Sequence, residues 1–265
     1  MEAAALGIFM ISAGACTALL EYPGSFVHQA LPNSDVRRAL IGVAMGATAT
    51  SLVYSPWGER SGAHMNPAVT MTFFRLGKIP PWDAFFYIAF QFLGGLAGVL
   101  LTALALGKPF TQSPVNYVVT VPGPAGNLAA FTGELVIAFA MMGMILFVSN
   151  KASVARFTGL FAGLLIMCYV AFEAPLSGFG MNPARTLASA IPSGIWTALW
   201  IYFTAAPLGM LLAAECYLRM KWRRSIRCCK LHHRSDRSCI FCDDRSSPKE
   251  VQHTAHTGCS QKTAI

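Results

Sequence analysis

Two ten-residue segments carry polar residue types whose spacing suits non-covalent chemistry. Residues 61–70 read Ser-Gly-Ala-His-Met-Asn-Pro-Ala-Val-Thr, and residues 177–186 repeat seven of these ten identities, 116 positions later. Asn is a favoured helix N-cap and Pro is favoured at the first helical position, so Asn66 and Asn182 should each begin a short helix, over about 66–75 and 182–190. If the amide oxygen caps the helix, the NH₂ group is left to donate to a neutral polar molecule such as water or an alcohol.

The other polar groups near these segments do not assemble into a catalytic site. Ser61 to Ala63, and Ser177 with Gly178, are small and present a ladder of backbone carbonyl acceptors. His64 is interpreted as a vestibule residue and not as a general base, because no nucleophile can be placed beside it. Arg185 follows the second Asn, and a charge in so apolar a setting is itself a functional hypothesis. The sequence predicts that the protein is not an enzyme.

Membrane-spanning helices are the elements expected to position these groups. Of the 265 residues, 54% are hydrophobic and only 12% are charged, whereas a soluble domain has about 25% charged residues. A helix needs ~20 apolar residues to cross a bilayer. The stretches of suitable length and composition lie at about 3–20, 37–55, 84–106, 128–149, 157–173 and 194–216. The first has no basic leader, so a removable signal peptide is not expected.

The two boxes belong to a longer internal repeat. Further matching pairs are Gly42 with Gly159, Gly46 with Gly163, and Glu2 with Glu134. Each copy, about 1–106 and 128–216, holds three spans, and an odd number of spans gives the copies opposite orientations in the membrane. The two short helices then meet N-terminus to N-terminus near the midplane, where their dipoles repel cations. The predicted fold is an all-α membrane protein with six transmembrane helices plus two re-entrant half-helices in an inverted repeat, with the glycines at close helix contacts.

The chain resembles the aquaporins and glycerol facilitators, or major intrinsic proteins, over about residues 1–218. The resemblance rests on both Asn-Pro-Ala boxes, the Ser-Gly-Ala-His before the first, Arg185 after the second, and the pair Glu2 and Glu134. It implies one pore in each subunit of a homotetramer in the lipid bilayer, passive conduction of water or small neutral solutes, and exclusion of ions and protons. It implies no cofactor. It also implies that the two glutamates brace the re-entrant loops by accepting backbone N–H bonds.

The resemblance further assigns the residues that select the solute. It puts Arg185 in the outer constriction, beside Met45 of the second span, Val170 of the fifth and Phe179 of the re-entrant loop. Water-selective members usually carry a His at the fifth-span position and an aromatic residue at the second-span position. Phe179 matches glycerol facilitators, although the acidic residue that usually follows the arginine in them is missing here. The expected pore conducts water and admits small uncharged solutes such as glycerol.

A coupled secondary transporter of a small neutral solute is the alternative. Such transporters are also built from inverted repeats and broken helices. They require titratable groups or ion sites at the midplane, and the residues expected there, Asn66 and Asn182, are neutral.

The net charge of +8 belongs mainly to a tail. Residues 219–265 hold 11 Lys/Arg and 4 Asp/Glu, which leaves +1 for the channel-like residues 1–218. A charge confined to a tail does not indicate nucleic-acid binding. Lys and Arg are also more frequent in the second and fourth connections than in the first and third. This bias predicts that both termini are cytoplasmic, in a plasma (cell inner) membrane.

The tail is also rich in metal-binding residue types. Cys229 with His232, and Cys239 with Cys242, are two pairs that each enclose two residues. This spacing suits a tetrahedral zinc site. The other interpretation is a disordered basic tail with reduced thiols that lies on anionic lipid headgroups. The sequence leaves both interpretations open.

Overall fold

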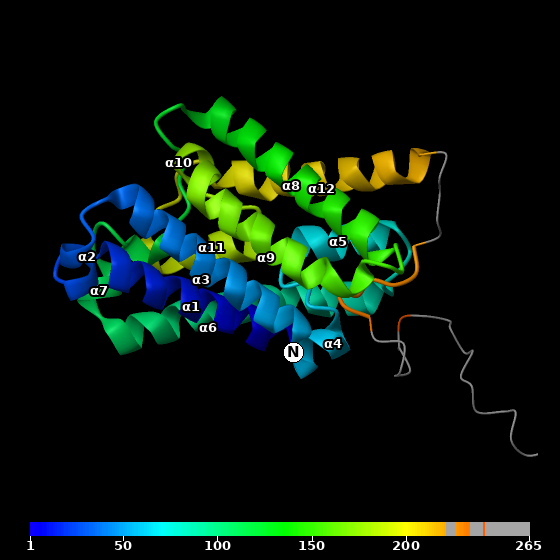
Figure 1. Ribbon diagram of the computed structural model, residues 1–265, viewed down its shortest axis with the longest axis horizontal. Helices are drawn as coiled ribbons and strands as arrows, with labels where there is room; N and C mark the ends of the chain where they lie inside the picture. Colours follow the sequence, from blue (N-terminus) through cyan, green and yellow to red (C-terminus); the bar gives the residue numbers. More distant parts are fainter. Residues whose placement is uncertain (221–225, 234–240, 242–265) are drawn as a thin grey trace, which may run out of the picture.

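Long helical segments run side by side along the length of the molecule (Figure 1), and six of those in the described residues are long and apolar enough to cross a bilayer. The computed structural model describes residues 1–220, 226–233 and 241. The segments long and apolar enough to cross a bilayer are α1 (Glu2–Glu21), α3 (Ser34–Tyr54), α6 (Pro81–Leu106), α8 (Asn127–Ser149), the segment Ala155–Ser177 and α12 (Leu199–Arg219). The fifth is composite and consists of η2 (Ala155–Phe157), α9 (Thr158–Cys168), the π-helical turn η3 (Tyr169–Glu173) and α10 (Ala174–Ser177).

Shorter helices lie at both ends of this bundle. The tail side, where α12 ends, holds α4 (Pro56–Ser61) and the half-helix α5 (Pro67–Arg75). The opposite end, here called the far side, holds α2 (Phe26–Ala30), α7 (Lys108–Thr111) and η1 (Asn116–Val118). The second half-helix, α11, spans Pro183–Ser193 and so runs beyond the expected residue 190. Gly194 ends α11 at a φ of 68°, and the last span therefore begins at Leu199 and not near residue 194.

The helix packing repeats between the two halves of the chain. α1 packs against α6 as α8 packs against α12, and α3 packs against α9 between the halves. The half-helices cross over, since α5 packs on α12 and α11 packs on α6. Each copy therefore covers part of the other. The predicted fold class, six spans with two re-entrant half-helices in an inverted repeat, is confirmed.

The matched glycines of α3 and α9 allow these two helices to approach closely. A Cβ on Gly46 would overlap the carbonyl oxygen of Gly163, and a Cβ on Gly163 would overlap that of Gly46 and the hydroxyl of Thr50. Small residues at such crossings let helix backbones come together in lipid, where apolar side chains gain little from leaving the solvent. The expectation of close packing at these glycines is confirmed.

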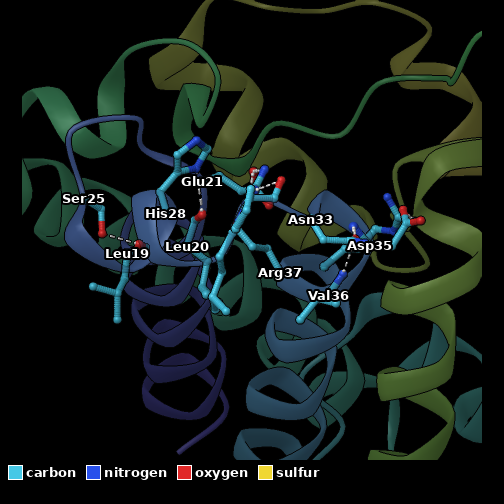
Figure 2. A network of polar contacts seen from close by, with 12 residues as sticks. Leu19, Leu20, Glu21, Ser25, His28, Asn33, Asp35, Val36 and Arg37 are labelled. Atoms are coloured by element: carbon cyan, nitrogen blue, oxygen red, sulfur yellow. Dashed lines mark hydrogen bonds and ion pairs between the residues drawn. The ribbon is translucent and has the colours of Figure 1, made fainter.

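The far-side connection between α1 and α3 is ordered by a buried arginine (Figure 2). Arg37 donates to the carboxylate of Glu21 at 3.0 Å and to the carbonyl oxygens of Leu31 and Pro32 at 2.7 and 3.0 Å. Asn33 caps α3, because its side chain accepts from the first backbone N–H groups of that helix. These contacts fix the far-side ends of α1 and α3 relative to each other.

Candidate functional site

The two Asn-Pro segments form the N-termini of α5 and α11, as their sequence predicts. The Asn66 side-chain oxygen accepts from the Ala68 N–H at 2.9 Å. The Asn182 side-chain oxygen accepts from the N–H groups of Ala184 and Arg185 at 3.0 and 3.2 Å. Proline follows each asparagine at a position where no N–H is needed. The two helices therefore begin at capped, fixed points.

The amide nitrogens of the two asparagines connect the repeats. Asn66 Nδ2 donates to the Met181 carbonyl at 2.8 Å, and Asn182 Nδ2 donates to the Met65 carbonyl at 2.6 Å. The expectation that the whole NH₂ group is free is therefore wrong, because one N–H of each amide is used by the opposite loop. Both asparagines line a central cavity, and the second N–H of each remains for a molecule in it.

The loops before the half-helices have the same unusual backbone in both repeats. Gly62 and Gly178 have φ of 98° and 84°, and they end α4 and α10 in the left-handed region. The non-glycine residues with left-handed φ at matching positions are Ala63 (55°) with Phe179 (51°), and Met65 (49°) with Met181 (42°). Such residues cost free energy unless their surroundings hold them, and they cluster at functional sites.

Two buried carboxylates hold these loops. Glu134 accepts from Ser177 Oγ and the Gly180 N–H, both at 2.6 Å, and from the Met181 N–H at 2.5 Å. Glu2 accepts from the N–H groups of the corresponding first loop, from His64 at 3.3 Å and Met65 at 2.7 Å. While the N–H groups of Met65 and Met181 are bound by the carboxylates, the carbonyl groups of the same two residues accept from the asparagine of the other loop.

Further supports of the loops are not predicted by the sequence analysis. Tyr87 and Tyr202 donate their hydroxyls to the carbonyls of Ser61 and Ser177, at 2.7 and 2.6 Å. These two carbonyls therefore already accept hydrogen bonds from the protein and are not open members of the expected acceptor ladder. Gln91 Nε2 donates to Glu2 at 2.8 Å. The available signal was a tyrosine or glutamine in an apolar span, since such a group needs a polar partner.

Two cavities meet at the predicted filter. The central cavity, of about 90 Å³, is lined by both asparagines and by His64, and the far-side cavity has about 350 Å³. The far-side cavity is lined by Met45, Val170 and Gly178. Phe179 and Arg185 line both cavities. The structure thus brings together the filter residues and puts Phe179 and Arg185 at the boundary between the two spaces.

Arg185 supplies charge and hydrogen-bond donors at this boundary. Its side chain is only 9% exposed, and Nη1 has no hydrogen-bond partner among the described residues. A buried guanidinium donor normally has a partner, so Arg185 offers this N–H to whatever occupies the cavity. Beside Phe179, Val170 and Met45, it is the charged member of an otherwise apolar ring.

His64 lies deeper than the expected vestibule position. It is 4% exposed and stacks on Phe73, with ring centroids 5.2 Å apart. Its Nδ1 lies 3.0 Å from Thr70 Oγ1, and its Nε2 lies 2.8 Å from the carbonyl oxygen of Cys229. The imidazole therefore joins the first re-entrant loop to the tail.

Comparison with known proteins agrees with this arrangement. Residues 2–217 match the model of the family described as Major intrinsic protein. The chain belongs to the major intrinsic protein family. It is 32% identical to Aquaporin NIP2-3 of Zea mays over 223 residues, which are 83% of this chain and 72% of that protein. It is 35% identical to Putative aquaporin NIP4-1 of Arabidopsis thaliana over 178 residues, 66% of this chain and 60% of that protein.

A solved major intrinsic protein has the same fold. The aquaglyceroporin from Plasmodium falciparum superimposes with a TM-score of 0.66 at 19% identity, covering 83% of this chain and 93% of that chain. The family consists of membrane transport channels and not of enzymes, and it gives no support to the coupled-transporter alternative. The aligned regions span between about 60% and 72% of the relatives named above.

The described part of the tail does not support a metal site. Cys229 is fully buried, and His232 Nε2 lies 3.9 Å from a carboxylate oxygen of Glu59. Among the residues that the structure describes, no group of three His, Cys, Asp or Glu side chains could hold a metal ion. The other two predicted ligands, Cys239 and Cys242, lie outside the described residues.

Proposed function

We propose that this protein is a passive channel that conducts water and small neutral solutes such as glycerol. The observation that carries the proposal is the pair of capped asparagines, which donate across the repeat interface at 2.8 and 2.6 Å and line one cavity. The oxygen of a passing hydroxyl group can accept hydrogen bonds from the remaining N–H groups, while its O–H donates a hydrogen bond to a backbone carbonyl. No titratable side chain has to change its charge in this process.

Ions and protons are excluded by the same elements. The N-termini of α5 and α11 face one region, and each carries about half a positive charge, so a cation meets two repelling dipoles. Arg185 adds a full positive charge at the boundary of the two cavities. A water molecule that accepts from both asparagines has its own hydrogens directed away from them, and this orientation interrupts proton transfer along a file of waters.

The residues that line the filter favour solutes larger than water. Val170 lies where water-selective members usually carry a histidine, which would narrow the passage and add a donor. Met45 lies where they usually carry an aromatic residue, whose ring is stiffer than the methionine side chain. Phe179 adds an apolar surface at the same boundary of the two cavities where Arg185 supplies donors. A polyol has both kinds of surface, with hydroxyls along one edge and CH groups along the other.

The assembly and orientation belong to the same proposal. Lys and Arg are more frequent on the tail side, and this bias supports a cytoplasmic position of both termini. The proposed location is the plasma (cell inner) membrane. Four copies form a homotetramer with one pore in each subunit, as the family resemblance implies. The channel unit is residues 1–218, and the basic tail is 219–265.

Val170→His tests the role of the filter. Proteoliposomes are exposed to water, glycerol and urea gradients in a stopped-flow instrument, and the ratio of glycerol to water permeability is measured, because this ratio does not depend on how many channels conduct. Histidine narrows the passage and adds a donor, so we expect the ratio to fall at least tenfold. Val170→Leu narrows the passage without a donor and should reduce both permeabilities. A ratio unchanged in Val170→His contradicts the proposed filter, and water permeability without any glycerol permeability in the unmodified protein eliminates glycerol as a solute.

A further inference from the structure

A short segment of the tail is packed into the channel. Residues 226–233, here called the tail plug, read Ile-Arg-Cys-Cys-Lys-Leu-His-His. They lie at the tail side near α4 and α5, where Figure 1 draws them in orange. Four of the eight side chains are buried, with exposures of 6% for Ile226, 5% for Cys228, 0% for Cys229 and 6% for Leu231. The tail plug is thus part of the packed structure, and the interpretation of the whole tail as a chain on lipid headgroups is wrong for these residues.

Hydrogen bonds hold the tail plug to separate elements around the tail-side mouth. The Arg227 N–H donates to Asn150 Oδ1 at the end of α8, at 2.9 Å. The Leu231 N–H donates to the Gly62 carbonyl of the first re-entrant loop, at 3.2 Å. His64 Nε2 lies 2.8 Å from the Cys229 carbonyl. The segment is therefore attached both to the first re-entrant loop and to the end of α8, which belongs to the second repeat.

The side chain of Leu231 reaches the central cavity. It lines this cavity together with Asn66 and Asn182 and belongs to the same apolar cluster as Val53 and Ala63. An alkyl group at this place offers no hydrogen bond to water. Far-side solutes meet a cavity of about 350 Å³ that none of the described tail residues lines. The contacts of the tail plug are therefore confined to the tail side.

The tail plug also occupies polar groups that water would need at this mouth. The Gly62 carbonyl is the first carbonyl of its loop that Tyr87 leaves open, and the Leu231 N–H uses it. The ring nitrogens of His64 face Thr70 and the Cys229 carbonyl. A water molecule that enters from the tail side has to replace these hydrogen bonds within the protein. Breaking a buried hydrogen bond costs free energy unless the new partner satisfies both groups.

We propose that the tail plug holds the pore closed at its tail side and that conduction requires its release. The proposal rests on the proposed channel function and adds a regulatory contact to it. Release exposes Leu231, the Gly62 carbonyl and His64 Nε2 together, so the plug behaves as one two-state element. Any process that favours the released state opens the channel by mass action.

Leu231→Asn in the full-length protein tests the closure. The substitution preserves side-chain size and removes the apolar burial, which is enough to change a two-state equilibrium by more than tenfold. The matched control is Leu128→Asn, because Leu128 is 80% exposed at the far-side start of α8. Osmotic water permeability per channel is measured in proteoliposomes of equal protein content. We expect at least a tenfold increase for Leu231→Asn and none for Leu128→Asn.

Trypsin cleavage after Lys230 measures the seating of the tail plug without any transport. Cleavage requires the segment to leave its site, so its rate reports the released fraction. In detergent micelles, with peptides followed by mass spectrometry, Leu231→Asn should be cut after Lys230 at least ten times faster than the unmodified protein and Leu128→Asn.

The two measurements separate failure of the plug from failure of the channel. The plug proposal is overturned if Leu231→Asn and the unmodified protein conduct water equally fast, or if cleavage after Lys230 is equally fast in both. If Leu231→Asn is cut faster and neither protein conducts water above empty vesicles, the proposed channel function is overturned, and the closure of a pore with it.

Discussion

Glu134→Gln is expected to destabilise the second re-entrant loop. The carboxylate accepts three hydrogen bonds, two at one oxygen, from Ser177 and Gly180, and one at the other, from Met181. In glutamine one of these oxygens becomes NH₂, which is itself a donor. Either orientation of the amide therefore sets donor against donor and leaves at least one buried N–H without an acceptor. The loss of a bond to a charged acceptor and the unsatisfied N–H together cost about 3 kcal/mol.

The effect is large enough to measure by thermal unfolding. At about 2–4 °C per kcal/mol for a chain near this size, the midpoint of the purified protein should fall by about 6–12 °C. Glu215→Gln is the matched control, because Glu215 forms an ion pair with the largely exposed Arg75, and exposed pairs contribute about 0–1 kcal/mol. Equal midpoints for the two variants would refute the bracing role of Glu134. Water permeability of Glu134→Gln should also fall, since the loop that it holds lines the central cavity.

Two other substitutions test the packing and the loop supports. Gly163→Ala forces a Cβ into the carbonyl oxygen of Gly46 and should lower the free energy of unfolding by about 1–3 kcal/mol. In the control Gly143→Ala, the new Cβ meets no neighbour within 4 Å, so this variant should be neutral or slightly stabilising. Unfolding midpoints that change in the same direction in both variants would contradict the close crossing of α3 and α9. Tyr202→Phe removes the bond to the Ser177 carbonyl and should cost about 1 kcal/mol, measured as a midpoint about 2–4 °C lower; an unchanged midpoint would mean that this bond does not support the loop.

Local signals in the sequence predict the architecture well. Asn-Pro has a direct meaning at a helix start, and the repeated boxes therefore predict α5 and α11 at their observed first residues. An apolar stretch of sufficient length has few alternatives to a spanning helix. The end of α11 was less predictable, because Pro192 lies within the helix and the left-handed Gly194 ends it.

Interactions between distant residues were harder to predict. The left-handed residues Met65 and Met181 donate their N–H groups to the carboxylates of Glu2 and Glu134, which are distant in the sequence. No local preference of methionine indicates this conformation. The use of the asparagine amides by the opposite loop depends on how closely the two repeats approach. The contact of His64 with Cys229 joins residues 165 positions apart. The tail plug contains apolar residues within an otherwise basic and polar tail. The composition of the tail alone does not predict that this segment packs against the channel.

The crossed bonds of Asn66 and Asn182 make the two copies of the repeat mutually dependent. Each loop receives a donor that only the other copy can supply, so a single copy would leave a carbonyl at membrane depth without its partner. Replacing the asparagine of one Asn-Pro-Ala segment therefore removes a hydrogen bond from the backbone of the other segment. The sequence still shows two copies of one repeat, but neither copy can satisfy its own loop without the other, so the two copies form one folding unit.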